Sequence, residues 1–202
     1  MGRSPVKLSD DLQRSCLASR TWFVGVSNTN LNLIPAIAMS NAPTASSNPS
    51  DRELVLTRII NAPPAEVYEA WTNPEIVVKW FAPKPWSTSS AQLDVRAGGD
   101  SVVTMRSPEG VDYPNRGVYL EVVPNKKLVF TDAFTKAWEP SEKPFMTGIL
   151  TFEEAGPGKT KYTARVVHWS VADREAHEQM GFHTGWGQCA DQLDALLNGR
   201  PF

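Results

Sequence analysis

The sequence predicts an α+β fold in which an antiparallel sheet wraps around a long C-terminal helix, with two short helices after the first strand. Two observations carry this prediction. Apolar and polar residues alternate in turn-linked runs between residues 87 and 169, as is typical of an antiparallel sheet with one buried face. Residues 172–198 instead carry apolar side chains at helical spacing. Because one long helix after many strands must bury its apolar side against them, we expect the sheet to surround it.

Residues 1–51 differ in composition from the rest. The first 38 positions hold four basic and two acidic residues without a clear period, and residues 40–50 are an uncharged run rich in Ser, Asn, Pro and Ala. We expect this segment to be disordered, or a leader followed by a linker. One interpretation is an organellar or export leader. The alternative, which we favour, is that the native protein starts at Met39. The folded domain is then expected over residues 52–199.

The first strand is predicted at residues 53–60, where β-branched and aliphatic residues dominate. Pro64 predicts a helix that starts there and continues to residue 71, because the first helical position needs no N–H donor. Asn73 and Pro74 predict a second short helix, with Asn73 as its N-cap, that runs to Trp80.

Six further strands are expected, and successive pairs are joined by turns rich in Gly, Pro or Asn. They are predicted at residues 87–96, 100–106, 117–123, 127–134, 145–153 and 159–169. The alternation assigns the following side chains to the inner face: Val118, Leu120, Val122, Leu128, Phe130, Tyr162, Ala164 and Val166. Continued to the strand ends, the same phase places Asp132 and His168 inside, which makes them the polar exceptions.

Residues 172–198 are expected to form one continuous helix, with Asp173 as N-cap and with Gly199 and Pro201 ending it. Its core side would contain Gln179, Phe182, Trp186, Cys189, Ala190, Leu193 and Leu197. Met180 and His183 would flank that side, within reach of whatever lies beside the core.

Composition excludes several classes of partner. The net charge of −2 gives no reason to expect nucleic acid or an anionic membrane surface. No apolar run approaches the roughly 20 residues of a membrane span. Cys16 and Cys189 are far apart, so we expect no disulfide framework and a cytoplasmic, reducing location.

Two motifs are best explained structurally. Residues 156–160 read Gly-Pro-Gly-Lys-Thr, but a phosphate-binding loop needs a glycine where Glu153 stands, and the segment lies between two strands, so we interpret it as a hairpin turn. His177 and His183 are six positions apart and fall on different helix faces, which argues against a zinc site. We expect no metal and no cofactor.

Asp132 and His168 are the only candidates for catalysis that the pattern yields, possibly joined by His183. If they face one cavity, the carboxylate could set the imidazole tautomer for general acid–base work. The alternative is that His168 is a buried histidine satisfied by a neighbour, and we favour this alternative because no nucleophile or second base stands near.

Several segments resemble the activator-of-Hsp90-ATPase homologue family of the START-like, or SRPBCC, superfamily. They are residues 61–75 (Asn-Ala-Pro-Pro-Ala-Glu-Val-Tyr-Glu-Ala-Trp-Thr-Asn-Pro-Glu), 79–83, 93–99, 117–124, 128–131 and 185–186. The resemblance covers about residues 53–198 and implies the helix-grip fold of that superfamily. The chain is similar to the stand-alone branch of that family, because residues 1–50 are not expected to form the additional chaperone-binding domain of a full co-chaperone.

The resemblance implies three functions. We favour non-catalytic binding of a small hydrophobic, aromatic or acyl molecule in an internal cavity, with Arg106 or His168 as polar anchor. The expected ligand-binding residues are Trp80, Phe81, Met105, Arg106, Phe130, Met146, His168, Met180 and His183. One alternative is a regulator that contacts a chaperone ATPase through its surface. The other is a polyketide-cyclase-like or hydrolase-type enzyme that uses Asp132 and His168.

Overall fold

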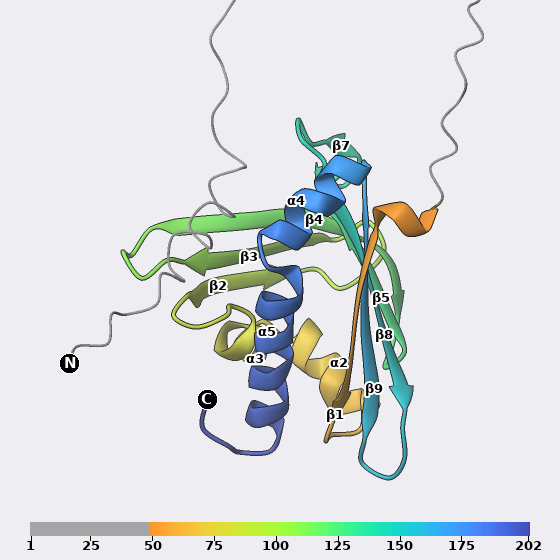
Figure 1. Ribbon diagram of the computed structural model, residues 1–202. Coiled ribbons are helices and arrows are strands. Elements are labelled where there is room, and N and C mark those ends of the chain that lie inside the picture. Colours follow the sequence, from red (N-terminus) through yellow and green to blue (C-terminus); the bar gives the residue numbers. More distant parts are fainter. Residues whose placement is uncertain (1–48) are drawn as a thin grey trace, which may run out of the picture.

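The computed structural model describes residues 49–202 (Figure 1). The chain starts with a short 3-10 helix η1 (Pro49–Arg52), strand β1 (Glu53–Ile60) and helices α2 (Pro64–Thr72) and α3 (Pro74–Trp80). The next strands are β2 (Ser87–Leu93), β3 (Asp100–Arg106), β4 (Asp112–Val123), β5 (Lys127–Thr131), β6 (Phe134–Lys136), β7 (Glu139–Pro140), β8 (Met146–Glu154) and β9 (Thr160–His168). Two helices, α4 (Val171–Gln179) and α5 (Phe182–Leu197), follow. None of the helices in this part of the chain is long and apolar enough to cross a membrane.

Seven strands form one antiparallel sheet in the order β1-β9-β8-β5-β4-β3-β2, while β6 and β7 form a small separate hairpin. Figure 1 shows the sheet bending, so that β2, β3 and β4 run across one side of α5 while β1, β9, β8 and β5 run along the other. The predicted α+β fold, with a sheet gripping the C-terminal helix, is therefore confirmed.

Strand β1 and helices α2 and α3 agree with the sequence prediction because the signals that predict them are local. β1 spans the expected residues, and α2 starts at Pro64. The Asn73 side chain accepts a hydrogen bond from the backbone N–H of Glu75 at 3.0 Å, and Pro74 occupies the first helical position of α3. Each helix start depends only on residues within one turn of it.

The predicted inner face of β4 is wrong at one point. The pairing of β4 with β5 shifts register between Tyr119 and Glu121. Leu120 is the extra residue of this irregularity and lies outside at 37% exposure, while Tyr119 is the one that is buried, at 3% exposure. On β9 the prediction is right, since Tyr162, Ala164, Val166 and His168 are all buried.

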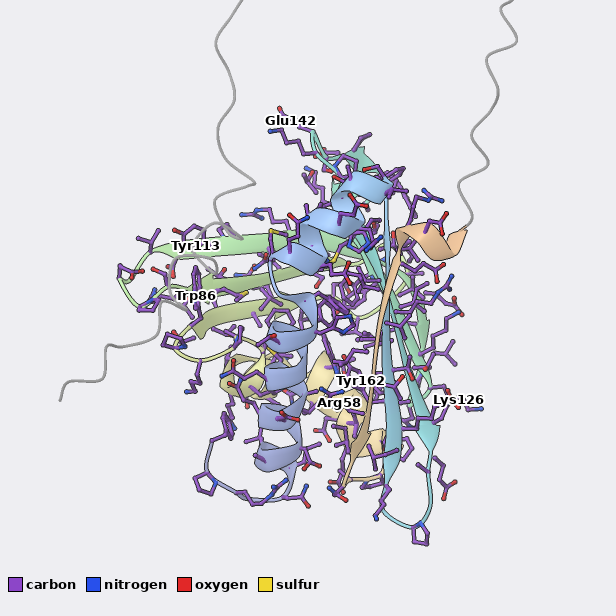
Figure 2. The ribbon with its side chains drawn as sticks, viewed as in Figure 1. Arg58, Trp86, Tyr113, Lys126, Glu142 and Tyr162 are labelled. Carbon is purple, nitrogen blue, oxygen red and sulfur yellow. The ribbon has the colours of Figure 1, made fainter. Side chains whose placement is uncertain are left out.

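The strand limits differ in further places. β2 ends at Leu93 and not at residue 96, and β4 begins at Asp112, earlier than predicted. The predicted strand 127–134 is divided into β5 and the start of the β6–β7 hairpin, which continues to Pro140. β5 ends at Thr131 because Asp132 turns its carboxylate onto the start of β8. Figure 2 shows Glu142 extending outward from this end of the molecule, in contrast to Tyr162 beside α5.

The expected single helix over residues 172–198 is in fact two helices. Gly181 adopts a φ of 92°, a left-handed conformation that side chains disfavour, and the chain changes direction there (Figure 1). Ser170 caps α4 by accepting from the backbone N–H of Asp173 at 3.0 Å, so Asp173 is not the cap. None of the α4 residues is fully buried, and Gln179 is exposed, because this helix is too polar to continue the apolar side of α5.

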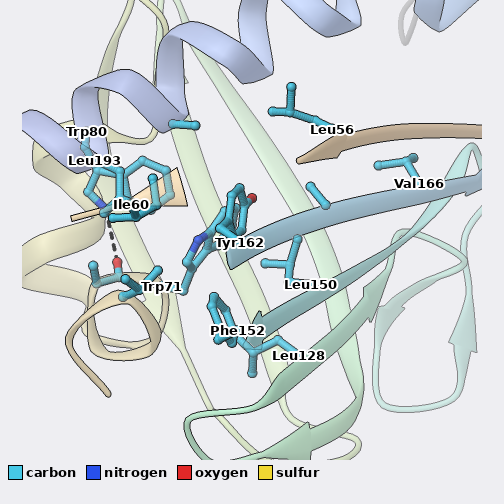
Figure 3. Packing of buried hydrophobic residues seen from close by; sticks show 14 of the residues in the cluster. Leu56, Ile60, Trp71, Trp80, Leu128, Leu150, Phe152, Tyr162, Val166 and Leu193 are labelled. Carbon is cyan, nitrogen blue, oxygen red and sulfur yellow. Dashed lines mark hydrogen bonds between the residues drawn. The ribbon is translucent and has the colours of Figure 1, made fainter. Parts of the chain in front are cut away.

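An aromatic core fills the space between α5 and the sheet (Figure 3). We call Trp71 and the four rings around it the Trp71 cluster. Ring centroids lie 4.8 Å from Trp71 for Trp80, 5.9 Å for Phe81, 6.0 Å for Tyr162 and 6.5 Å for Phe130. Such distances are typical of favourable aromatic pairs.

Gln192 of α5 ties this core to the segment after α3. Its Nε2 donates to the carbonyl oxygens of Trp80 at 2.7 Å and Ala82 at 2.9 Å, and its Oε1 accepts from the backbone N–H of Lys84 at 3.2 Å. The amide is buried and fully used. It therefore fixes the position of α5 along the sheet.

Candidate functional site

The expected ligand-binding residues fall into two groups. Trp80, Phe81 and Phe130 meet in the Trp71 cluster, and Met146 packs partly buried against the same core. The others lie elsewhere. Met105 is on β3, paired with Thr88 and Tyr113, Met180 is the C-cap of α4, and His183 is exposed on α5.

Arg106, one of the two predicted polar anchors, lies at the surface. Its guanidinium binds the Asp112 carboxylate through two hydrogen bonds of 2.7 and 2.9 Å, and its side chain is 47% exposed. The adjacent Trp86 and Tyr113 rings, 5.3 Å apart, lie at this same end of the sheet (Figure 2). Arg106 is therefore paired at the surface with Asp112.

Trp71 carries a buried polar atom without a protein partner. The residue is 8% exposed, and its Nε1 makes no hydrogen bond with any residue in 49–202, whereas Nε1 of Trp80 donates to the carbonyl of Ala70 at 3.1 Å. A buried donor left unpaired costs about 1–3 kcal/mol. Such a group is a candidate contact for a bound molecule or an ordered water.

A hollow of about 40 Å³ borders the Trp71 cluster beside Trp80, Trp86 and Thr88. This volume suffices for water. It is well below the roughly 300–1,000 Å³ of small-molecule sites. This hollow is too small for such a molecule, so a ligand would have to move side chains to enter here.

Beneath α4, two histidines form a direct hydrogen bond. His168 ends β9 and is 1% exposed, and its Nε2 lies 2.8 Å from Nδ1 of His177 on α4. Its other nitrogen, Nδ1, lies 3.0 Å from the carbonyl oxygen of Arg52. The alternation along β9 predicted that His168 is buried. Its partner His177 could not be predicted, because the contact depends on α4 packing back over the end of β9.

Aromatic rings surround this pair, and we call the five residues the histidine cluster. The Phe145 ring lies 5.4 Å from His168 and 5.3 Å from His177, and Phe182 and Trp186 lie 5.1 and 6.5 Å from His177. Burial lowers the pKa of His177 to about 4, with His168 adding to the effect, and burial also lowers the pKa of His168. Both rings are therefore neutral near pH 7.

Asp132 does not pair with His168, as the catalytic alternative would need, but with the backbone at the start of β8. Its carboxylate accepts hydrogen bonds from the backbone N–H groups of Phe145 at 2.9 Å and Met146 at 3.0 Å. Burial raises its pKa, and these two hydrogen bonds oppose the rise. The Asp132–His168 hydrogen bond that the catalytic alternative requires is not among the contacts of either side chain in residues 49–202. Asp132 instead anchors Phe145, which forms one wall of the histidine cluster.

Within residues 49–202, no three His, Cys, Asp or Glu side chains are grouped so as to hold a metal ion. The neutral histidine pair, its aromatic walls and the unpaired indole N–H of Trp71 are the chemically distinctive groups of the interior. They can form hydrogen bonds with a largely apolar molecule, and they provide no charge at neutral pH.

Comparison with solved structures shows the same fold in bacterial proteins. A protein from Nitrosomonas europaea is 39% identical, with a TM-score of 0.71 over 74% of this chain and 96% of that chain. A protein from Chromobacterium violaceum is 26% identical, with a TM-score of 0.58 over 72% and 96%. One from Mycobacterium smegmatis, at 23% identity, shares the fold with a TM-score of 0.65 over 77% and 96%.

No curated protein matches the chain. The family model described as activator of Hsp90 ATPase homolog 1-like protein matches residues 61–198, which include the Trp71 cluster and both histidines of the pair. Domains with this START-like fold are in general ligand-binding or regulator domains. The chain therefore belongs to the activator of Hsp90 ATPase homolog 1-like protein family.

Proposed function

We propose that this domain binds a small hydrophobic molecule with an aromatic ring between α5 and the sheet, without converting it chemically. The observation that carries the proposal is the Trp71 indole N–H, which is buried among four aromatic rings and has no acceptor in residues 49–202. A ligand oxygen that accepts a hydrogen bond from Nε1 would remove the cost of leaving this buried donor unpaired, and the rings would supply apolar contact.

The energetics favour such a ligand. Apolar area removed from water stabilises a complex by roughly 25 cal/mol per Å² before the cost of ordering is subtracted. Phe130, Met146 and Trp186 are partly buried against the core and extend it toward the histidine cluster. The interior is therefore continuous in apolar character from Trp71 to His177.

Entry beneath α4 costs less than entry elsewhere. This helix contributes no fully buried residue, and it is joined to α5 through Gly181 at positive φ. Segments with little buried apolar surface open most easily. We therefore place the route of the ligand between α4 and the ends of β8 and β9.

A pair of matched substitutions on β9 tests the interior site. Ala164 is fully buried and points inward, whereas its neighbour Thr163 points outward and bonds Thr57. With 2-methoxynaphthalene as probe, followed by tryptophan fluorescence, Ala164→Leu should weaken binding at least tenfold because it fills the interior. Thr163→Leu should change binding less than twofold. Circular dichroism verifies both folds, and unchanged affinity in Ala164→Leu would rule the interior site out.

The native ligand can be sought directly. Native mass spectrometry of the protein purified from its own cells, followed by denaturation, should release a small molecule of defined mass. We place this activity in the cytoplasm, a proposal consistent with the free thiol of Cys189, which is turned toward the carbonyl of Phe81 at 3.1 Å. If the protein released a chemically altered form of this molecule during incubation, the proposal of non-catalytic binding would be wrong and the domain would be an enzyme.

A second candidate is regulation of a chaperone ATPase, which the family description suggests. Val55 and Ile59 favour it, because they are 47% and 52% exposed on the outer face of β1, an edge strand. In that case Val55→Glu with Ile59→Glu should abolish stimulation of ATP hydrolysis by an Hsp90-type chaperone, and Ala164→Leu should preserve it. The interior-site proposal expects no stimulation by the wild-type protein.

A further inference from the structure

The hydrogen bonds of the histidine pair determine where its protons are. A carbonyl oxygen can only accept, so Nδ1 of His168 must carry the hydrogen that bonds Arg52 at 3.0 Å. In a neutral ring the other nitrogen, Nε2, is then an acceptor. Nδ1 of His177, 2.8 Å away, must therefore donate to it. Both Nδ1 hydrogens are used, and Nε2 of His177 is left with a lone pair.

This lone pair stands in an aromatic environment. Phe145, Phe182 and Trp186 surround the His177 ring, and none of the hydrogen bonds among residues 49–202 reaches its Nε2. The residue is half-buried and its Nε2 is not among the fully buried unpaired atoms of residues 49–202, so water reaches this nitrogen until a ligand takes its place. His168 acts on it as a positioning residue, because the bond to Arg52 excludes the other tautomer.

The charged groups around the pair leave it neutral. His168 is influenced by Asp173 and Arg174 of α4 and by Asp132 after β5, while Arg52 of η1 contributes its carbonyl. Asp173 and Asp132 favour a protonated His168 and Arg174 opposes it, and the effect of burial exceeds all of them. On α5, His183 is exposed and lies against Phe182 on the solvent side. A neutral imidazole nitrogen of this kind is a good hydrogen-bond acceptor, and a ligand that displaces its water must supply a donor in exchange.

We propose that Nε2 of His177 accepts a hydrogen bond from the bound molecule, whose class is then an aromatic compound with an acidic hydroxyl, a phenol or an enol. This inference rests on the proposed function, because it assumes a ligand in the same interior. The aromatic walls select the ring, and the lone pair selects a donor over an ether or a ketone. A neutral hydroxyl also avoids burying a charge, which a carboxylic acid would create on transferring its proton.

The test compares two probes that differ only in the donor. 2-Naphthol carries a hydroxyl, and 2-methoxynaphthalene carries the same ring system without it. His177→Phe keeps a ring of similar size and removes the lone pair. It should weaken 2-naphthol binding about tenfold, as expected for the loss of one hydrogen bond, and leave 2-methoxynaphthalene within twofold. His183→Phe, the same substitution at the exposed histidine, should affect neither probe.

The tautomers can be measured without any variant. In ¹⁵N NMR of the wild-type protein, both histidines should show a protonated Nδ1 and a bare Nε2, and only Nε2 of His177 should shift strongly when 2-naphthol is added. A protonated Nε2 on free His177 would overturn the assignment. Equal loss of both probes in His177→Phe would also overturn it while leaving the interior site intact. Failure of the wild-type protein to bind either probe would overturn both proposals.

Discussion

The two ends of the helical layer are held by different kinds of contact. At the lower end in Figure 1, α5 buries Leu193 and Ala190 against the sheet, and Gln192 bonds three backbone groups. At the upper end, α4 buries no residue completely and is held mainly through His177 and a few polar contacts with η1. Stability therefore concentrates in one half, and the more weakly held half carries the free hydrogen-bonding group.

The largest effect should come from removing an anchor of α5. Leu193 is fully buried, so Leu193→Ala should lower the free energy of unfolding by about 2–5 kcal/mol through lost apolar burial and a cavity. Val171→Ala, a truncation in half-buried α4, should cost less than about 1 kcal/mol. Urea denaturation measures both. Equal losses would show that the two ends are equally packed.

Acid should destabilise the α4 end selectively. The pKa of folded His177 is about 4, against 6.5 for an ordinary histidine. Above pH 6.5 the ring is neutral in both states and has no effect. Between pH 6.5 and 4 the unfolded chain binds the proton first, so the free energy of unfolding should fall, by about 3 kcal/mol at most.

His168 acts in the same direction, because burial lowers its pKa as well. Denaturant melts across this pH range should show a smaller fall for His177→Phe than for the wild-type protein. A variant with the same pH profile as the wild type would mean that His177 is not buried in the neutral form.

Gln192→Leu tests the polar fastening of α5. The substitution leaves the carbonyls of Trp80 and Ala82 and the N–H of Lys84 without their partner, which should cost about 2 kcal/mol. Gln188→Leu serves as control, since that side chain makes one bond of 3.3 Å to the carbonyl of Lys84. In the same urea titration, Gln188→Leu should lower the free energy of unfolding by less than half as much as Gln192→Leu. A larger decrease would mean that Gln188 contributes more than Gln192 to holding α5.

The smallest effects concern the junction between the two helices. Gly181→Ala should destabilise by about 1 kcal/mol, because φ of 92° disfavours a side chain although space is open there. Gly185→Ala, inside α5 with nothing within 4 Å of the added carbon, should instead stabilise by up to about 1 kcal/mol. Thermal melts should shift in opposite directions, and a stabilising Gly181→Ala would mean that α4 and α5 can join into one helix.

Local sequence is enough to predict the parts of the fold whose causes lie within a few residues. Strand β1, the start of α2 at Pro64 and the Asn73 cap of α3 follow from local preference, and the alternation on β9 was enough to bury His168. The family resemblance supplied the helix-grip arrangement, and the sheet order agrees with it.

The remaining features could not be predicted from the sequence, because they depend on contacts between distant segments. The register shift opposite β5 buried Tyr119 in place of Leu120. The polar α4 buries no residue completely, and the helix is interrupted at Gly181. With α4 in this position, His177 forms a hydrogen bond with His168. A contact between the end of a strand and a helix that packs back over it cannot be read from the sequence spacing of the two histidines.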